Sequence, residues 1–209
     1  MDNVPFTFCD AVLSLLWKSY APIDRFRDLP ALLWLQSYRS AQPRLSTFSA
    51  LFAFDHNHRW RCRFTNVESD ELIRIGEFRK IPTRYRRIQE VFIDIDDLTA
   101  ALLLDSMETL NFATLTSILA SNSLVQRLNI KDYGSGFTYY IFKALHEKVR
   151  FVELQMEMFI PRQIGFFAEF VEDQVKSGKL RDVAIGANFP KSTIEWIRQQ
   201  PVAAQIWWY

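Results

Sequence analysis

Several residue types that mark specialised proteins are scarce in this chain of 209 residues. It contains 2 Cys, 6 Gly and 8 Pro. The two thiols, Cys9 and Cys62, have no regular spacing, which argues against a disulfide framework and predicts a reduced, intracellular protein. So little Gly and Pro argues against long low-complexity segments.

An excess of either charge is missing as well, because 25 Lys and Arg are balanced by 24 Asp and Glu. Domains that bind nucleic acid usually carry a marked basic excess, so no nucleic-acid partner is expected. One basic cluster stands out, and on a balanced chain it is interpreted as a solvated face. Its members are Arg79, Lys80, Arg84, Arg86 and Arg87.

Long apolar runs are also missing, since no stretch approaches the roughly 18 apolar residues that span a membrane. The N-terminus carries Asp2 and Asp10 in place of a basic segment. Its apolar run from Ala11 to Trp17 is broken by Ser14, so no signal peptide is expected. These features predict a cytoplasmic or nuclear protein with no membrane partner.

The motifs of common enzyme classes are absent too. The chain has 3 His and lacks G-x-S-x-G, the P-loop and G-x-G-x-x-G. His56 and His58 lie beside Asp55, but no Cys or further His is close enough in sequence to complete a metal site. We interpret this segment as a solvated polar turn.

A cluster of acidic residues is the other candidate metal site. Carboxylates suit divalent cations, but acids at a strand end and at helix starts explain the cluster better. We therefore predict no metal, no cofactor and no catalytic residue, and a small metal-dependent enzyme is the least favoured alternative. The cluster comprises Asp94, Asp96, Asp97, Asp105 and Glu108.

Aromatic residues, by contrast, are abundant, with 18 Phe, 7 Tyr and 6 Trp making up 15% of the chain. Because aromatic side chains bury large areas, a sizeable core is expected. Trp and Tyr are also favoured anchors of protein interfaces, so some could belong to a binding surface.

The chain divides into three sections. Residues 1–44 have apolar residues at helical spacing and predict a small helical module. Residues 45–82 alternate apolar and polar positions on either side of a polar turn, which predicts a β-hairpin bridge. Residues 83–209 alternate strand-like and helix-like segments, so a mixed α+β or α/β fold is expected.

The third section repeats the pattern apolar-x-x-apolar-x-apolar, with a helical stripe in each gap. Short strands and helices repeated in this way predict a leucine-rich-repeat-like array, in which stacked units share one core. An open, doubly wound sheet with the same alternation is the competing interpretation. The copies are Ile88-Val91-Ile93, Val125-Leu128-Ile130, Val149-Val152-Leu154, Leu180-Val183-Ile185 and a looser Ala203-Ile206-Trp208. Two of the stripes are Phe112, Leu115, Ile118 and Leu119, and Phe137, Tyr140, Ile141 and Ala144.

Residues between the apolar positions of each strand are expected on the opposite, concave face of the array. Their charges run acidic, basic, acidic across successive strands, which suits a protein partner. An ordinary solvated sheet face explains the pattern equally well. The residues are Glu90, Phe92, Asp94, Arg127, Asn129, Lys131, Glu153, Gln155, Glu157 and Asp182.

Two stretches resemble a known family. Val4-Pro5-Phe6, followed by an apolar helical stripe, resembles the start of an F-box, which opens with an apolar-Pro pair and continues into an amphipathic helix. The phrase Ser177-Gly178-Lys179-Leu180, followed by a strand and by Phe189-Pro190, is similar to the C-terminal region of the expanded nematode F-box family. The third helical stretch, Leu32 to Tyr38, lacks that family's usual Cys-Lys-x-Trp-like ending.

This resemblance implies a substrate receptor of a Skp-cullin-F-box ubiquitin ligase. The F-box-like module would bind a Skp-type adaptor protein, and the repeats would bind an unidentified target protein. A stand-alone binder or neutraliser of a partner protein, without ligase recruitment, is the alternative. The adaptor-binding face that the resemblance implies consists of Val4, Pro5, Phe8, Val12, Leu13, Leu16 and Leu29.

Overall fold

A computed structural model shows the arrangement of the chain from residue 45 onward, with gaps. The described residues are 11–12, 45–55, 59–83, 85–94, 106–122, 124–132, 137–146, 148–158, 164–186 and 188–207. Val12 is therefore described, in helical conformation and partly buried. The other six residues of the implied adaptor-binding face lie outside the described residues, namely Val4, Pro5, Phe8, Leu13, Leu16 and Leu29.

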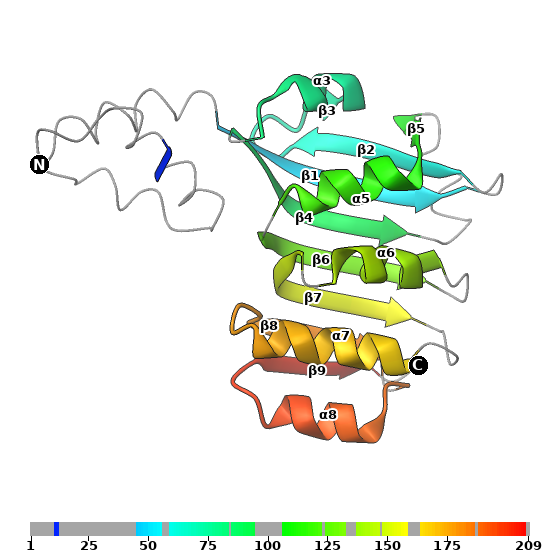
Figure 1. The fold of residues 1–209 in the computed structure, drawn as a ribbon, viewed down its shortest axis with the longest axis vertical. Helices are drawn as coiled ribbons and strands as arrows, with labels where there is room; N and C mark the ends of the chain where they lie inside the picture. The colour runs from blue at the N-terminus through cyan, green and yellow to red at the C-terminus, as the bar shows by residue number, and fades with distance from the viewer. Residues whose placement is uncertain are drawn as a thin grey trace, which may run out of the picture.

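The described residues form a mixed α/β structure around one nine-stranded sheet, which confirms the expected class of fold (Figure 1). The strands are β1 (Ser46–Phe54), β2 (Trp60–Asn66), β3 (Leu72–Ile73), β4 (Arg86–Asp94), β5 (Glu108–Leu110), β6 (Leu124–Asp132), β7 (Arg150–Met158), β8 (Asp182–Gly186) and β9 (Ala203–Trp207). The helices are α3 (Ile75–Lys80), α5 (Phe112–Ala120), α6 (Phe137–Leu145), α7 (Ile164–Lys176) and α8 (Lys191–Arg198). None of these helices is long and apolar enough to cross a membrane.

The strand order is β3-β2-β1-β4-β6-β7-β8-β9, and β5 pairs with the outer side of β2. The predicted hairpin is present, because β1 and β2 pair antiparallel from Phe48 and Asn66 to Phe54 and Trp60. On its other side β1 pairs in parallel with β4. The hairpin is thus the first part of the same sheet, and it shares one hydrophobic core with the strands and helices that follow.

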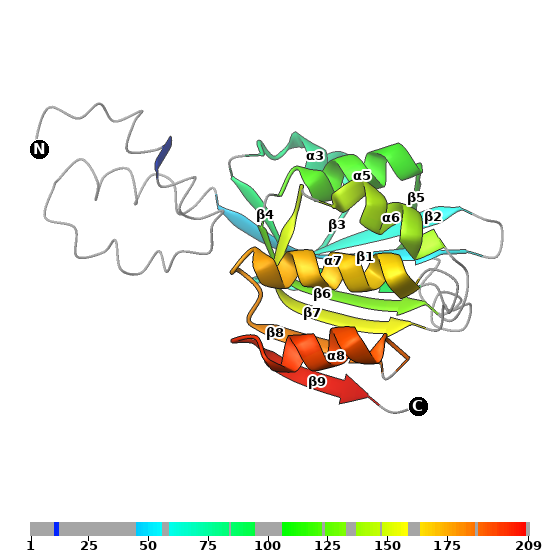
Figure 2. The same cartoon turned by 60° about the horizontal axis from the view of Figure 1, so that its bottom comes forward.

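β4, β6, β7, β8 and β9 are parallel and adjacent in that order, whereas β5 pairs antiparallel with β2. Helices α5, α6, α7 and α8 all lie on one face of the sheet (Figures 1 and 2). A doubly wound sheet would instead carry helices on both faces. One face is therefore covered by helices, and the opposite face, which we call the open face, is not covered by any described helix.

The apolar positions of the strands align across the sheet in two rows that face the helices. Val91 pairs with Leu128, Leu128 with Leu154, and Leu154 with Val183. The third copy of the repeated apolar pattern was predicted two residues too early in the chain. Leu154, rather than Val152, stands opposite Leu128. Val152 is only partly buried, whereas Phe151 is buried and begins the copy that fits the register.

The fifth copy is also displaced. Ile206 pairs with Ile185 and Ala204 with Val183, so Ile206 takes the third apolar position rather than the second. Trp208 lies outside the described residues. In both cases neighbouring apolar residues offered two registers, and pairing with the preceding strand selected one of them.

Aromatic side chains fill much of the core, as their abundance predicted. At the hairpin end, the ring of Phe78 stacks on Phe64 at 4.2 Å between centroids and meets the edge of Phe48 at 5.1 Å. Under α7, Phe142 contacts Phe170 at 4.4 Å and Phe167 at 5.3 Å. All six side chains are fully buried.

Two buried amides connect helices to the starts of strands. The side chain of Asn122, just after α5, accepts a hydrogen bond from the N–H of Ile88 at 3.1 Å. Gln174 of α7 accepts one from the N–H of Phe151 at 3.1 Å and donates to the carbonyl of Val149 at 3.2 Å. Each of these bonds gives a buried backbone group a hydrogen-bond partner.

The basic cluster does not form one solvated face. Arg79 and Lys80 are exposed as predicted, but Arg86 is buried, which corrects the prediction for that residue. Its guanidinium lies 4.5 Å from the centroid of the Phe78 ring and donates to the carbonyl of Phe78 at 2.9 Å. Burial lowers the pKa of Arg86 below its usual value, and the charge of Arg79 adds to this effect. Arg84 lies outside the described residues.

Candidate functional site

The predicted binding residues come together on the open face. Strand alternation points them away from the helices, and the parallel register places them side by side in three rows. All of them are at least partly exposed. The rows are Glu90-Arg127-Glu153-Asp182, Phe92-Asn129-Gln155 and Asp94-Lys131-Glu157.

Arg127 is the centre of an ionic ladder across three strands. Its Nε donates to Glu153 at 2.6 Å, and its Nη1 donates to Glu90 at 3.2 Å. The hydrogen bond to Glu153 raises the pKa of Arg127, and the charges of Glu153 and Glu90 reinforce this shift. The side chain of Arg127 is 43% exposed, so water screens the ladder and its contribution to stability is small. What the ladder does provide is a fixed geometry for charges at the surface.

The next charged row is looser. The ammonium group of Lys131 lies 3.8 Å from the carboxylate of Glu157, and Asp94 is the register neighbour of Lys131 on the other side. In the first row, Asp182 is the register neighbour of Glu153, so two acids adjoin there. The alternation of charge predicted from the sequence is therefore present as a spatial pattern on one surface.

A hollow of about 350 Å³ lies in the part of the open face nearest the hairpin. Its floor includes Leu51 and Phe92, which are register neighbours, and its rim includes Arg63 and Lys131. The Nη1 of Arg63 makes only a long 3.5 Å hydrogen bond to Ser106, and its buried Nε has no hydrogen-bond partner among the described residues. The hollow therefore combines an apolar floor with two cations, and Asp94 also lines it.

The residues from β1 and β2 were missed by reasoning from sequence, because the hairpin was treated as a bridge outside the repeat array. The alternation of Leu51 with Ala50 and Phe52 did indicate which way Leu51 points. Only the parallel pairing of β1 with β4 shows that Leu51 and Arg63 belong to the same surface as Phe92. A second hollow of about 350 Å³ lies beyond Arg127, between β7, β8 and β9.

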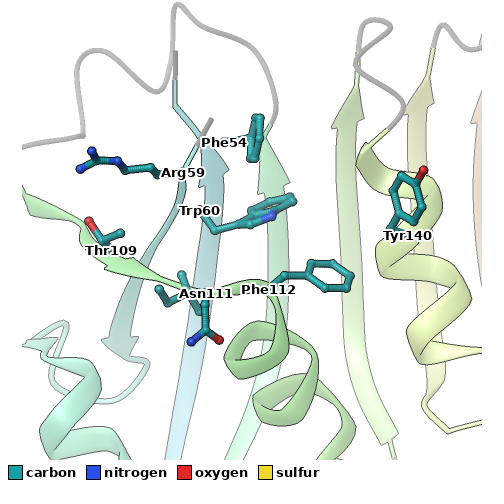
Figure 3. Close-up of a pocket in the computed structure, with 8 residues that line it drawn as sticks. Phe54, Arg59, Trp60, Thr109, Asn111, Phe112 and Tyr140 are labelled. Atoms are coloured by element: carbon teal, nitrogen blue, oxygen red, sulfur yellow. The ribbon is translucent and has the colours of Figure 1, made fainter. Parts of the chain in front are cut away.

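A larger pocket of about 650 Å³ lies on the other side of the sheet (Figure 3), and we call it the aromatic pocket. The rings of Phe54 and Trp60, at the tip of the hairpin, meet edge to face at 5.0 Å between centroids. Asn111 caps α5 by accepting a hydrogen bond from the N–H of Thr114 at 2.8 Å. This cap begins the helix so that Phe112 faces the pocket (Figure 3). The remaining lining residues are Arg59, Thr109, Leu110 and Tyr140.

Comparisons with protein-family models, with curated proteins and with solved structures find no match for this chain. The geometry of the surfaces described above therefore carries the functional argument.

The candidate metal sites are not assembled in the part of the chain that the structure describes. Within it, no three His, Cys, Asp or Glu side chains lie close enough together to hold a metal ion. Asp55 is buried and accepts hydrogen bonds from the N–H of Arg59 and the Nε of Arg61, each at 2.9 Å. Asp94 and Glu108 are described, on β4 and β5. His56, His58, Asp96, Asp97 and Asp105 lie outside the described residues.

Cys62 has no nucleophilic character in this environment. It is a free thiol on the helix-facing side of β2 and is 2% exposed. Burial, with the charge of Glu108, raises the pKa of Cys62 to about 12, although Arg79 acts in the opposite direction. Because the thiolate is the reactive form of cysteine, a thiol with this pKa is inert at neutral pH.

Proposed function

We propose that this chain is a non-catalytic protein-binding adaptor whose open face binds a target protein. The observation that carries the proposal is the set of register-fixed charge rows beside the hollow formed by Leu51 and Phe92. Fixed charges of both signs select a partner with the complementary pattern and steer its approach. The apolar floor supplies a place for an anchoring side chain.

The mixture of charges favours a protein over a polyanion. A nucleic acid presents negative charge along its whole length, so the acids Glu90, Glu153 and Asp182 would repel it. A protein surface can place a base opposite each acid and an acid opposite Arg63 or Lys131. The proposal therefore retains a protein target and no nucleic acid.

We further propose that the parallel strands β4, β6, β7, β8 and β9, with their helices, act as a short leucine-rich-repeat-like array. Support comes from the chain-ordered parallel strands, from the helices on a single face and from the aligned apolar rows. In such arrays each strand-helix unit contacts mainly its neighbours, and the strand face forms an extended binding surface.

Recruitment of a ubiquitin ligase is a separate part of the proposal. It rests on the likeness of Val4-Pro5 and the following apolar stripe to an F-box. A stand-alone binder would use the same open face without this docking step. Co-purification with a Skp-type adaptor distinguishes the two functions: stoichiometric capture that is lost on changing Pro5→Ala and Leu16→Ala supports the ligase receptor, and absence of capture contradicts it.

Target binding is tested by a matched pair of charge reversals. Lys131 pairs with Glu157 on the open face, and Lys176 pairs with Glu172 on the exposed side of α7. Lys131→Glu is expected to abolish recovery of the target by affinity purification from the native cell, whereas Lys176→Glu leaves recovery unchanged. Equal recovery with both variants would show that the open face is not the binding surface.

A further inference from the structure

The strand β9 forms one edge of the sheet, and β8 is its only strand neighbour among the described residues (Figures 1 and 2). Proteins usually protect an edge strand from pairing with another chain by a charged residue, a proline, a bulge or a very short strand. The five residues of β9, from Ala203 to Trp207, include no charge and no proline, and their register with β8 is unbroken. The outer side of β9 is therefore free of these protections.

The opposite edge of the sheet is protected in the usual way. Two short strands, β3 with two residues and β5 with three, share the outer side of β2. Charged residues lie within or beside these strands, namely Glu71, Arg74 and Glu108. Short strands and charges both hinder pairing with another chain. Of the two edges, only that of β9 is suited to receive a further strand.

The backbone of β9 directs unpaired groups outward. The N–H of Ala203 donates to the carbonyl of Arg181 at 2.7 Å, so Ala203 directs its backbone groups toward β8. Successive residues of a strand direct their backbone groups to opposite sides in the plane of the sheet. The N–H and C=O of Ala204 and Ile206 therefore point away from β8, where no described strand pairs with them.

The apolar rows that face the helices are incompletely covered at β9. In β4, β6, β7 and β8, both residues that belong to these rows are at most 2% exposed. Their counterparts in β9, Ala204 and Ile206, pack against the same core but are only partly buried. A further strand beside β9 would remove more of this apolar surface from water, which favours pairing.

We propose that β9 pairs antiparallel with β9 of a second copy of this chain, about a two-fold axis that passes between the two Gln205 residues. In this register, Ala204 exchanges both of its outward backbone hydrogen bonds with Ile206 of the second copy. Among the registers that keep the helices of both copies on one face, only this one pairs both outward residues with outward residues of the other β9. The two sheets then form one continuous sheet.

The side chains of β9 fit this register on both faces. On the helix-covered face, Ala204 lies opposite the larger Ile206 of the second copy. On the open face, Ala203 lies opposite Trp207, and Gln205 lies opposite Gln205. Small residues thus face large ones, and no like charges meet, as cross-strand packing favours. In a two-fold interface the same patch must complement itself, and the sequence of β9 does so, which favours a second copy over a strand of an unrelated protein.

Pairing of this kind would also place two open faces side by side. Ala203 and Gln205 line the second hollow of the open face, between β7, β8 and β9. Trp207 of the second copy would lie beside this hollow, because it stands opposite Ala203. The pairing itself depends only on β9, so it is expected whether or not the open face binds a target protein.

The first measurement is the mass of the full chain in solution. A five-residue edge forms a small interface, so we expect a reversible dimer with a dissociation constant on the order of 10 to 100 µM. Sedimentation equilibrium at chain concentrations from about 5 to 500 µM covers this range. A chain that stays monomeric throughout contradicts the proposal, and this outcome includes the case in which β9 binds a strand of a different protein.

A proline in β9 tests whether the dimer forms through this edge. Ala204→Pro removes an outward N–H but none of the bonds to β8, and proline is tolerated at such positions of edge strands. The variant is expected to weaken the dimer at least about tenfold, since its loss occurs in both copies. Circular dichroism verifies that the variant folds. A dimer of unchanged strength would show that the copies meet through another surface.

A charge at Gln205 tests the register, and it decides the proposal even if Ala204→Pro fails to fold. Gln205 is exposed and faces its own copy, so Gln205→Lys and Gln205→Glu are each expected to weaken the dimer about twofold to fivefold. An equimolar mixture of the two variants should dimerise more tightly than either alone. Ser69→Lys and Ser69→Glu, exposed at the hairpin end, are the matched controls and should dimerise as the unchanged chain does. A mixture no tighter than the single variants would overturn the proposal.

Discussion

The two ends of the sheet are stabilised in different ways. At the hairpin end, strands run antiparallel, and Phe78 of the short helix α3 packs between two Phe rings and the guanidinium of Arg86. In the parallel part, aligned aliphatic rows repeat from strand to strand, and buried amides such as Gln174 connect helix to strand. The hairpin end therefore depends on one cluster that combines aromatic rings with a cation. The parallel part depends on similar apolar contacts that repeat from strand to strand.

This difference suggests how each end responds to mutation. A cluster built around one residue loses several interactions at once when that residue is removed. A repeated contact loses one unit while its neighbours remain. Since both ends share one hydrophobic core, damage at either end is expected to lower the stability of the whole described sheet.

The largest effect is expected from Phe78→Ala. Phe78 is fully buried, so its truncation should cost about 3 to 5 kcal/mol of unfolding free energy. The change also removes the ring beneath Arg86, which adds to the loss. Urea denaturation measures the effect. Phe142→Ala is the matched change in the parallel part, since Phe142 is equally buried but contacts no cation among the described residues. Equal losses in the two variants would contradict the importance of the Arg86 contact.

The next effect concerns the buried amides. Gln174→Ala should lower the unfolding free energy by about 1 to 3 kcal/mol, because the N–H of Phe151 and the carbonyl of Val149 lose their partner in a buried position. Gln199→Ala is the control, since Gln199 is exposed at the end of α8. If both variants were as stable as the unchanged chain, the amide would not be what connects α7 to β7.

The sequence predicted correctly which residues of each strand share a face, but it did not predict every pairing between neighbouring strands. Alternation indicated that Glu90, Arg127 and Glu153 point to the same side, and the structure places them in one row. The third copy was misplaced because Val149, Phe151 and Val152 are all apolar and permit two registers. Pairing between strands far apart in sequence decides such cases, and local periodicity does not contain that information.

The sequence pattern also did not predict the burial of Arg86 or the assembly of the aromatic pocket. Arg86 belongs to a basic cluster, yet the ring and the carbonyl of Phe78, eight residues earlier, hold it inside the protein. The aromatic pocket draws residues from β1, β2, β5, α5 and α6, so no single motif indicates it. One feature of the sequence did indicate the pocket. The apolar stripe of each helix contains an aromatic residue that the structure leaves exposed, Phe112 in α5 and Tyr140 in α6.

A pH-dependent effect is expected at the hairpin end. Burial raises the pKa of Cys62 from 9.0 to about 12, so the folded state keeps the thiol protonated where the unfolded state would ionise. This contribution to stability is fully present below pH 9.0 and is lost as the pH rises toward 12. At pH 10 the loss should be on the order of 1 kcal/mol.

Urea denaturation at several pH values tests this linkage, and Cys62→Ala is the comparison. Lys and Tyr residues also titrate in this range, so the informative quantity is the difference between the two proteins. The unchanged chain should lose more stability between pH 8 and pH 10 than the variant does. Parallel pH profiles would mean that the thiol ionises as readily in the folded protein as in the unfolded chain.

The smallest effect on stability is expected from Arg127→Ala, although it removes both bonds of the ionic ladder. Because Arg127 is 43% exposed, the change should cost no more than about 1 kcal/mol, even though Glu90 and Glu153 lose their common partner. Recovery of the target protein should nevertheless fall sharply, since the row that Arg127 holds together is part of the proposed binding surface. Gln126→Ala, the same truncation one residue earlier on β6, is the control for the loss of a long polar side chain. A loss of several kcal/mol in Arg127→Ala would instead make the ladder a structural element of the parallel part, comparable to the Phe78 cluster at the hairpin end.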